Sequence, residues 1–373
     1  MLSNGTRSEE QVMRKILILT NHSFMLYRFR RELIAELLKE NEVVLSMPCD
    51  EYVGDFKAMG CKIIDTYVNR RGINPITDIR LLRTYFKIIR GENPDLVITY
   101  SIKPNVYGGY ICSKLGISYC VNVQGLGTAF QKKGLEKVVT IMYKIALEKA
   151  KIVFFENDGN AELFRQRNIT TVKHQMVLHG AGINLDYYPY QPYAEDGCVR
   201  FLFVGRIMRE KGINELFYAA KKIKAEYGDK VVFDLVGFFE DEYKETVEQL
   251  EREGIIIFHG FQQEVRTFYA KANCVVLPSY HEGMSNVLLE AASTGRVLIT
   301  SDISGCREAV EPDVSGYLCP VANSESIYCS MRRILTLTAE ERKIMGIAGR
   351  KRMESLFDKR KVVMATLAGI LED

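Results

Sequence analysis

Short apolar runs alternate with helix-like segments along the whole chain. In the first half each apolar run is a predicted strand, and the segments between the runs repeat their apolar residues every three to four positions. Continuous apolar strands that alternate with helices indicate parallel sheets covered on both faces. The predicted strands are Ile16–Leu19, Val43–Met47, Ile63–Ile64, Leu96–Thr99, Tyr119–Val123 and Ile152–Phe155, and the predicted helices are Tyr27–Lys39, Asp78–Arg90, Asn105–Leu115 and Leu135–Lys149.

The same pattern restarts near residue 200, which predicts an α/β protein with two doubly wound parallel-sheet domains facing across a cleft. The domains are expected at residues 13–186 and 198–354, joined by a linker at 187–197 that contains two prolines. A C-terminal helix near 355–373 is expected to pack back on the first domain. Residues 1–12 are expected to be a flexible extension. The later strands are predicted at Arg200–Val204, Val231–Val236, Ile255–Phe258, Cys274–Leu277 and Val297–Thr300, with a helix after Gly212.

Composition narrows the class of protein. Hydrophobic residues make up 47% of the 373 positions and charged residues 26%, as in globular proteins. There is no apolar run of about 18 residues to span a membrane, and the polar start lacks the apolar region of a secretory signal. Nine cysteines without a Cys-x-x-Cys pair and five scattered histidines favour a reducing cytoplasm and predict no metal site.

Charge is unevenly distributed along the chain. Residues 1–180 carry 26 Lys and Arg against 18 Asp and Glu, whereas the whole chain carries 50 and 47, so the remainder is acidic. Candidate partners for the basic half are nucleic acid, an anionic membrane or a phosphorylated lipid. The helix Asp78–Arg90 has a cationic and an apolar face. With Arg70-Arg71 and Lys132-Lys133 it could rest on a membrane, or it could be a core-facing helix with a solvated basic face.

A first candidate binding segment follows the strand Arg200–Val204. Gly205 would let the backbone approach a ligand, and the next helix start offers unpaired N–H groups to an anion. Arg206 and Lys211 lie five positions apart across the turn, so both cations could converge on one pyrophosphate. The alternative is an ordinary strand–helix turn with two surface cations.

A second candidate segment runs from Glu282 to Glu290, after an apolar strand that ends at Pro278. Gly283 marks a loop, Ser285 is a suitable N-cap, and a helix is predicted to begin at the next residues. Backbone N–H groups between the two glutamates are expected to point at a ligand. Either carboxylate could accept hydroxyl hydrogen bonds, Glu290 from a ribose and Glu282 from a sugar. The order of strand, proline, glycine loop and helix start distinguishes the pair from a chance spacing.

Together the two segments resemble the signature of the family-4 retaining glycosyltransferases. Val-Gly-Arg206 and Lys211-Gly, followed by Glu282-Gly-x-Ser-Asn and Glu290-Ala, carry this resemblance, which extends from Lys15 onward and implies the GT-B fold. It implies that the cations hold the donor's phosphates, Glu282 the transferred sugar and Glu290 the ribose. It makes Arg206, Lys211 and Glu282 the candidate catalytic residues. The implied donor-binding set is Gly205, Arg206, Lys211, Gly260, Glu282, Gly283, Met284, Ser285, Asn286, Val287 and Glu290.

Two neighbouring segments have a clear structural alternative. Gly260 follows a predicted strand, at a place where family members let backbone groups read the base. His259, just before it, is at least as well explained as a half-buried histidine at the strand end. Ser304–Glu308 is interpreted as a structural turn and helix start.

Residues of the first half are candidates for the acceptor. In the loop Thr20–Arg30, His22 is the natural base by residue type, although capping or packing explains this loop equally well. Lys103 precedes a helix start at Pro104 and suits a phosphate on the acceptor. Many relatives have a histidine where this chain has Gln124, which cannot act as a base. The acceptor candidates are Asn21, His22, Ser23, Lys103, Gln124, Gly125 and Gly127.

These acceptor segments resemble the subgroup that builds capsule, O-antigen or lipid-linked glycans on a polyprenyl diphosphate, in particular an N-acetylgalactosaminyltransferase. The resemblance implies a UDP-sugar donor, a polyprenyl-diphosphate-linked acceptor, and a cytoplasmic enzyme at the inner face of the membrane, with no nucleic-acid partner. No Asp-x-Asp pair occurs, so we expect no metal or other cofactor. We expect front-face transfer with retention. The alternatives are a UDP-sugar 2-epimerase of the same fold and a non-catalytic nucleotide-sugar-binding subunit.

Overall fold

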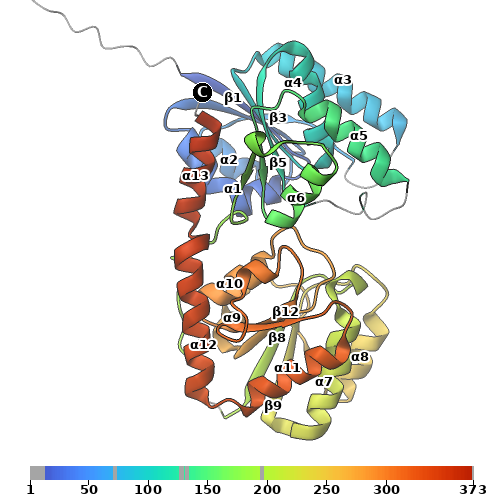
Figure 1. Ribbon diagram of the computed structural model, residues 1–373, viewed down its shortest axis with the longest axis vertical. Coiled ribbons are helices and arrows are strands. Elements are labelled where there is room, and N and C mark those ends of the chain that lie inside the picture. Colours follow the sequence, from blue (N-terminus) through green and yellow to red (C-terminus); the bar gives the residue numbers. More distant parts are fainter. Residues whose placement is uncertain (1–12, 70–73, 126–129, 131–133, 194–196, 372–373) are drawn as a thin grey trace, which may run out of the picture. The chain divides into compact units, whose positions relative to one another are not determined.

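The computed structural model describes residues 13–69, 74–125, 130, 134–193 and 197–371, which form two compact units (Figure 1). The N-terminal unit comprises Met1–Phe154, Leu163–Met176 and Thr366–Asp373. The C-terminal unit comprises Phe155–Glu162 and Val177–Ala365. None of the helices in these described ranges is both long and apolar enough to cross a membrane.

The N-terminal unit is built on a seven-stranded sheet with the order β3-β2-β1-β4-β5-β6-β7. The strands from β1 to β5 pair in parallel, as the continuous apolar runs predict. The first six strands confirm the predicted ones, whereas the short β7 was not predicted. The bounds are β1 Arg14–Leu19, β2 Asn41–Met47, β3 Lys62–Asp65, β4 Leu96–Tyr100, β5 Ser118–Val123, β6 Ile152–Phe155 and β7 Gln175–Val177.

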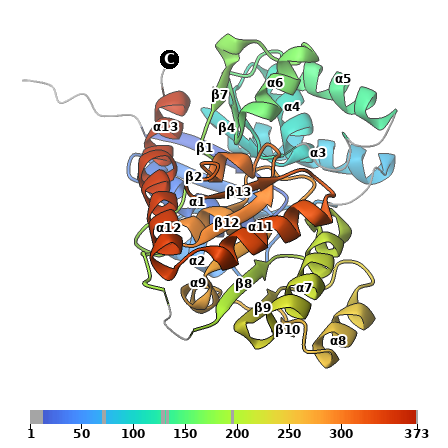
Figure 2. The same ribbon diagram turned by 60° about the horizontal axis from the view of Figure 1, so that its bottom comes forward.

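Helices cover both faces of this sheet. The strand order reverses between β1 and β4, and right-handed crossovers therefore place α3, α4 and α5 on the face opposite α1 and α2. Figures 1 and 2 show α3, α4 and α5 grouped together. The bounds are α1 Ser23–Leu37, α2 Val53–Ala58, α3 Pro75–Glu92, a π-helix Pro104–Gly108, α4 Gly109–Leu115, α5 Leu135–Leu147, α6 Asp158–Gln166 and a 3₁₀ turn Val172–His174.

The C-terminal unit contains a six-stranded parallel sheet with the order β10-β9-β8-β11-β12-β13. The five predicted strands are present, although β10 is shorter than predicted, and β13 is additional. The strand bounds are β8 Val199–Val204, β9 Val231–Val236, β10 Ile257–Phe258, β11 Cys274–Leu277, β12 Val297–Ser301 and β13 Gly316–Cys319.

Among the described residues, the helices from α7 to α13 belong wholly or mainly to this unit. The bounds are α7 Ile213–Tyr227, α8 Lys244–Arg252, α9 Arg266–Lys271, α10 Asn286–Ser293, α11 Ser324–Thr336, α12 Ala339–Arg352 and α13 Lys359–Leu371. Shorter helical turns are Arg209–Lys211, Gly228–Lys230, Arg307–Ala309 and the π-helix Met353–Phe357.

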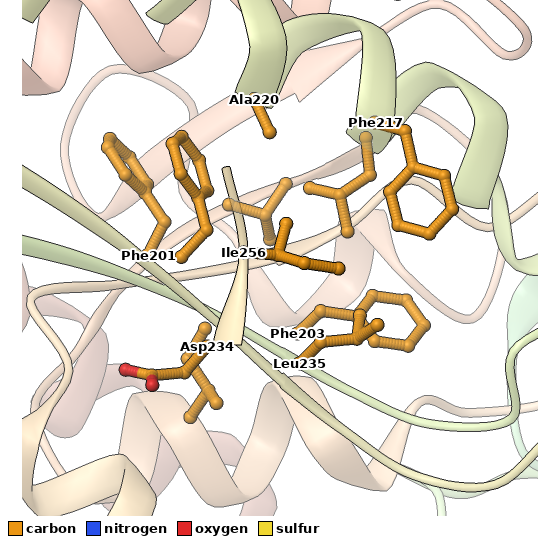
Figure 3. Close-up of a pocket in the computed structure, with 11 residues that line it drawn as sticks. Phe201, Phe203, Phe217, Ala220, Asp234, Leu235 and Ile256 are labelled. Carbon is orange, nitrogen blue, oxygen red and sulfur yellow. The ribbon is translucent and has the colours of Figure 1, made fainter. Parts of the chain in front are cut away.

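An aromatic core lies beneath α7 in the C-terminal unit (Figure 3). The rings of Phe201 and Phe233 stack with their centroids 5.2 Å apart. The cavity beside them measures about 10 Å³, enough for one water molecule at most, so it is a packing gap and not a ligand site. Asp234 lines the gap, and its carboxylate is held by Arg200 at 3.3 Å and His259 at 2.7 Å.

The chain passes between the units at different residues from the predicted boundary. The segment Val177–Ala365 belongs to the C-terminal unit, and side chains of that unit bind the backbone of the segment before β8. Ser293 Oγ donates to the carbonyl of Tyr188 at 2.7 Å, and Arg350 donates to the same carbonyl at 2.8 Å. The end of α13 lies with the N-terminal unit, where Lys151 Nζ donates to the carbonyl of Ile370.

Candidate functional site

The loops that follow β8 and β11 meet where the strand order of the C-terminal sheet reverses. Ligands of such sheets bind beyond the carboxyl ends of the strands at this switch point. Tyr280 N–H donates to the carbonyl of Glu210 at 2.8 Å, which joins the two loops. Gly212, with φ of 69°, packs so closely that a β-carbon there would lie 2.0 Å from the carbonyl oxygen of Pro278. The first residues of α7 are therefore fixed against the end of β11.

Lys211 and Glu282 meet at this junction. The Lys211 ammonium forms an ion pair with Glu282 Oε1, and Ser279 Oγ donates to the same oxygen at 2.8 Å. The side chains of Lys211 and Glu282 are only 17% and 13% exposed. Within the described residues, Glu282 Oε2 has no hydrogen-bond partner, so it remains available to a hydroxyl group. The structure thus brings together two of the three candidate catalytic residues.

Arg206 lies apart from this pair. Its side chain is 45% exposed, and Nη1 is 3.9 Å from Glu240 Oε1. Among the described residues, no hydrogen bond or ion pair joins Arg206 to Lys211 or Glu282. An exposed ion pair at this distance contributes little to stability, so the guanidinium can turn towards an incoming anion at low cost.

The loop after Glu282 is held by other parts of the same unit. Asn157 Nδ2 donates to the carbonyl of Gly283, and the N–H of Ser285 donates to the carbonyl of Gly305 at 2.8 Å. Helix α10 begins at Asn286 as predicted, but the Ser285 side chain makes no capping hydrogen bond. The expectation that N–H groups throughout this loop face a ligand is therefore corrected for Ser285, whose N–H closes the loop.

Three further residues of the donor-binding set are buried or half-buried. Met284 is buried, and a β-carbon at Gly180 would lie 2.5 Å from its Cγ. Glu290 is buried as well, and its Oε2 accepts a hydrogen bond from the Tyr269 hydroxyl at 2.9 Å. Ribose hydroxyls bound by Glu290 would therefore share its carboxylate with the Tyr269 hydroxyl. Val287 lies half-buried in the first turn of α10, where N–H groups lack acceptors inside the helix.

His259 lies at the end of its strand as a half-buried histidine, one of the two interpretations that the sequence allows. His259 is half-buried, with Nε2 2.7 Å from Asp234 Oδ1 and its ring 4.8 Å from that of Phe268. Gly260 has φ of 65°, and its carbonyl accepts the N–H of Gly237 at 2.9 Å.

The segment Ser304–Glu308 forms a turn that leads into a 3₁₀ helix. Glu308 Oε2 accepts the N–H of Gly305 at 2.7 Å, and burial raises the pKa of the Glu308 carboxyl. A β-carbon at Gly305 would lie 2.4 Å from the carbonyl oxygen of Gly283. This turn therefore packs directly against the loop after Glu282.

The N-terminal sheet has its own switch point, between β1 and β4. Ser101 Oγ donates to Asn21 Oδ1 at 2.7 Å across the two loops. Ser101 has φ of 76°, a backbone conformation that costs a residue other than glycine about 1–3 kcal/mol and is concentrated at functional sites. Ser23 is buried and donates to Asp50 Oδ1 after β2. Asn21 and Ser23 are thus each bound by a residue that was not predicted, Asn21 by Ser101 and Ser23 by Asp50.

The remaining acceptor candidates are His22, Lys103, Gln124, Gly125 and Gly127, and those that the structure describes lie in different surroundings. His22 occupies the N-cap position of α1 without a side-chain cap bond, and its ring lies 5.7 Å from that of Phe24. Lys103 precedes the π-helix as predicted, yet its ammonium pairs with Asp78 at 2.7 Å in a half-buried position. The ammonium expected to bind an acceptor phosphate is thus paired with a carboxylate of α3, as that of Lys211 is with Glu282. Gln124 and Gly125 are half-buried beyond the end of β5, and Gly127 lies outside the described residues.

Several supporting residues were missed from the sequence. Ser279, Asn157 and Tyr269 each hold an atom of the loop or of its two glutamates, and Ser101 joins the loops of the other sheet. Ser279 and Ser101 each lie within two residues of the carboxyl end of a predicted strand. This position is a signal that could have identified them. Asn157 and Tyr269 act from distant segments and carry no comparable signal.

Replacing Gly212 by alanine should destabilise the C-terminal unit, because the new methyl group would overlap the Pro278 carbonyl. We expect a loss of about 2–4 kcal/mol in the free energy of unfolding, from overpacking added to a left-handed backbone. Urea denaturation measures it. Gly254→Ala is the matched control, since Gly254 has a similar φ of 68° and no atom within 4 Å. Equal losses in the two variants would contradict the close approach.

Comparisons with known proteins agree with this arrangement. Residues 15–157 match the family "Glycosyl transferase 4-like", and residues 191–352 match "Glycosyl transferases group 1". The first match falls mainly on the N-terminal unit and the second on the C-terminal unit. The chain belongs to the GT-B glycosyltransferases and is an enzyme of that class.

Two related proteins and one solved structure are similar to this chain over most of its length. The chain is 25% identical over 361 residues to N,N'-diacetylbacillosaminyl-diphospho-undecaprenol alpha-1,3-N-acetylgalactosaminyltransferase of Campylobacter jejuni, covering 92% of this chain and 94% of the relative. It is 24% identical to UDP-Gal:alpha-D-GlcNAc-diphosphoundecaprenol alpha-1,3-galactosyltransferase of Escherichia coli, covering 71% and 72%. The structure of Anabaena Alr3699/HepE in complex with UDP and glucose shares the fold, with a TM-score of 0.78, 14% identity, and coverage of 96% and 100%.

Proposed function

We propose that this enzyme moves a hexose or N-acetylhexosamine, with N-acetylgalactosamine the best candidate, from a UDP-sugar to a glycan linked to a polyprenyl diphosphate. The observation that carries the proposal is the Lys211–Glu282 pair at the switch point of the C-terminal sheet, with a free carboxylate oxygen beside a cation. The names of the two relatives support a diphosphate-linked lipid acceptor, and the second name supports a UDP-sugar donor.

The donor would bind through charge and through hydroxyl recognition. Lys211 supplies a half-buried cation to the diphosphate, and Arg206 can turn from Glu240 to reach it. The first turn of α10 adds N–H groups that have no intrahelical acceptor. Glu282 Oε2 would accept a hydroxyl of the transferred sugar. Glu290 would accept one ribose hydroxyl, with Tyr269 fixing the carboxylate.

The chemistry proposed is front-face transfer with retention of the anomeric configuration. The bond between the anomeric carbon and the β-phosphate oxygen breaks, leaving an oxocarbenium-like sugar, and the acceptor hydroxyl attacks from the same face. The leaving phosphate takes the proton of that hydroxyl. Stabilising the departing diphosphate is the protein's largest task, and preorganised cations in a partly dry site do this most effectively.

We propose that the acceptor is recognised by the N-terminal unit and that the enzyme works at the inner face of the cytoplasmic membrane. The hydrogen-bonded pair Asn21–Ser101 lies at the switch point of that unit, where a ligand is expected, and Ser23 is two residues further along the chain from Asn21. All nine cysteines are free thiols, which supports a reducing compartment.

A transfer assay tests the proposal directly. Purified enzyme should move radiolabel from a UDP-sugar to a short-chain polyprenyl-diphosphate-linked saccharide, and NMR of the product should show the anomeric configuration of the donor. An inverted product would refute retention. Without acceptor, UDP-N-acetylglucosamine should be recovered unchanged, whereas its 2-epimer would identify an epimerase. UDP binding without transfer to any lipid-linked saccharide would refute the enzymatic role.

The donor itself can be found by thermal shift. A sugar nucleotide that binds only the native protein stabilises it by about 2.7 kcal/mol at a hundred times its Kd, so the correct donor should raise the Tm most. We expect UDP-linked N-acetylhexosamines to outrank GDP-sugars. A larger shift with GDP-sugars would contradict the assignment of the nucleotide.

A further inference from the structure

The outward face of α3 carries large apolar side chains among cations. Ile76 is 72% exposed, and Ile79 and Phe86 are exposed on the same side of the helix. Leu81 and Tyr85 are buried on the opposite side of the helix. The helix therefore has a full apolar contact with its own core and a second apolar stripe that faces outwards. The interpretation as a core-facing helix with a purely solvated basic face is incomplete, because three exposed side chains of that face are apolar.

Helix α5 repeats this feature. Ile141 is 57% exposed, and Val138 and Ile145, one turn away on either side, are exposed with it. Helix α4 contacts both α3 and α5 and adds the exposed Tyr110. Figures 1 and 2 show the three helices as neighbours in the N-terminal unit. We call the exposed faces of these three helices the α3–α5 surface.

The charge of the α3–α5 surface is almost entirely positive. The three helices contain three carboxylates, and each is paired with a cation from outside them: Asp78 with Lys103, Glu92 with Lys62, and Glu136 with Arg167. The helices also contain seven Lys and Arg residues. Within the described part of the chain, none of these seven has a carboxylate within 4.0 Å. The seven are Arg80, Arg83, Lys87, Arg90, Lys114, Lys137 and Lys144.

We propose that the α3–α5 surface docks on an anionic lipid bilayer. The apolar side chains enter the boundary between headgroups and acyl chains, while the cations that alternate with them bind lipid phosphates. A nucleic acid would match the cations but leave isoleucine and valine without apolar partners. A membrane matches both. The inference rests on the proposed function only in that a lipid-linked acceptor requires the enzyme to reach a bilayer.

Vesicle co-sedimentation of the full chain tests the surface. Wild-type enzyme should sediment with vesicles of phosphatidylglycerol and phosphatidylcholine and remain in solution with phosphatidylcholine alone. The variant Ile79→Asn/Phe86→Asn/Ile141→Asn should lose at least about tenfold in binding, because three apolar side chains no longer enter the boundary. Arg83→Glu/Lys87→Glu should lose at least about tenfold as well, since each cation near an anionic surface contributes about fivefold.

Controls come from the C-terminal unit. Ile344 is similarly exposed, and Ile344→Asn should bind vesicles as wild type does; Lys221→Glu/Lys230→Glu should weaken binding less than reversal on α3. Each variant's Tm should stay near that of wild type, and urea unfolding identifies any variant that is not folded. Equal loss in controls and test variants would overturn the proposal, as would wild-type binding to RNA but not to vesicles.

The outcome is separable from that of the transfer assay. In detergent with a short-chain acceptor, the apolar variant should transfer sugar as wild type does, because the substitutions lie outside the donor and acceptor clusters. Vesicle binding without any transfer would overturn the proposed function and leave the docking surface standing. Transfer without vesicle binding would overturn the docking surface alone.

Discussion

Replacing Lys211 by methionine should lower kcat by about 10²–10³-fold and raise KM for the sugar nucleotide. Methionine keeps the length of the side chain and removes the charge. The site would lose its half-buried cation and retain the Glu282 carboxylate, which would then repel the donor's diphosphate. Steady-state transfer rates at saturating acceptor, with the donor varied, measure both constants.

Two variants sharpen this result. Lys221→Met removes an exposed lysine of α7, within the same unit, and should change kcat by less than about twofold. Lys211→Arg keeps a positive charge and should retain more activity than Lys211→Met. A Lys211→Met enzyme with kcat within about tenfold of wild type would remove this residue from the proposed mechanism.

Replacing Arg296 by methionine should cost about 3–5 kcal/mol of stability. Arg296 is fully buried, and its guanidinium donates to the carbonyls of Ala272 at 2.9 Å and Thr294 at 3.1 Å, and to that of Gln191. Burial lowers the pKa of the Arg296 guanidinium, so these carbonyls and the Tyr193 ring, 4.3 Å from Cζ, must hold the charge. Methionine would leave several buried carbonyls without donors. Urea or thermal unfolding would measure the loss.

Arg333 is a close match for the control. Its guanidinium pairs with Asp313 at 2.7 Å and lies 4.0 Å from the centroid of the Tyr317 ring, but the side chain is exposed. Arg333→Met should therefore cost no more than about 1 kcal/mol. If Arg296→Met lowers the free energy of unfolding by as little as Arg333→Met, the hydrogen bonds of the buried guanidinium do not stabilise the segment before β8.

Much of the fold follows from local pattern. Strands buried on both faces, such as β1 and β11, are continuous apolar runs and were predicted within one or two residues. The strands that were missed or shortened, β7, β10 and β13, are short and lie at sheet edges. The strands β7 and β10 are also partly exposed, so they carry no such run. Helix α1 begins before its apolar pattern, because the buried Ser23 is anchored by Asp50 and starts the helix.

The candidate site was predicted where its residues directly follow strands. Lys211 and Glu282 belong to loops after neighbouring strands, and the structure joins them. The sequence could not show which polar atoms the protein itself occupies. Lys103 is neutralised by Asp78 from α3, and Glu290 is bound by Tyr269 from α9, two contacts that depend on tertiary packing between segments far apart along the chain. The same holds for the strained backbone of Ser101.

The Lys211–Glu282 pair has a consequence for turnover. Because Glu282 already supplies the Lys211 ammonium with a counter-ion, binding of the proposed donor would be an exchange of partners. Under the proposed mechanism, Glu282 is engaged by the sugar only until transfer, and afterwards it competes with UDP for the same ammonium. The acid that recognises the substrate would then also help to expel the spent nucleotide.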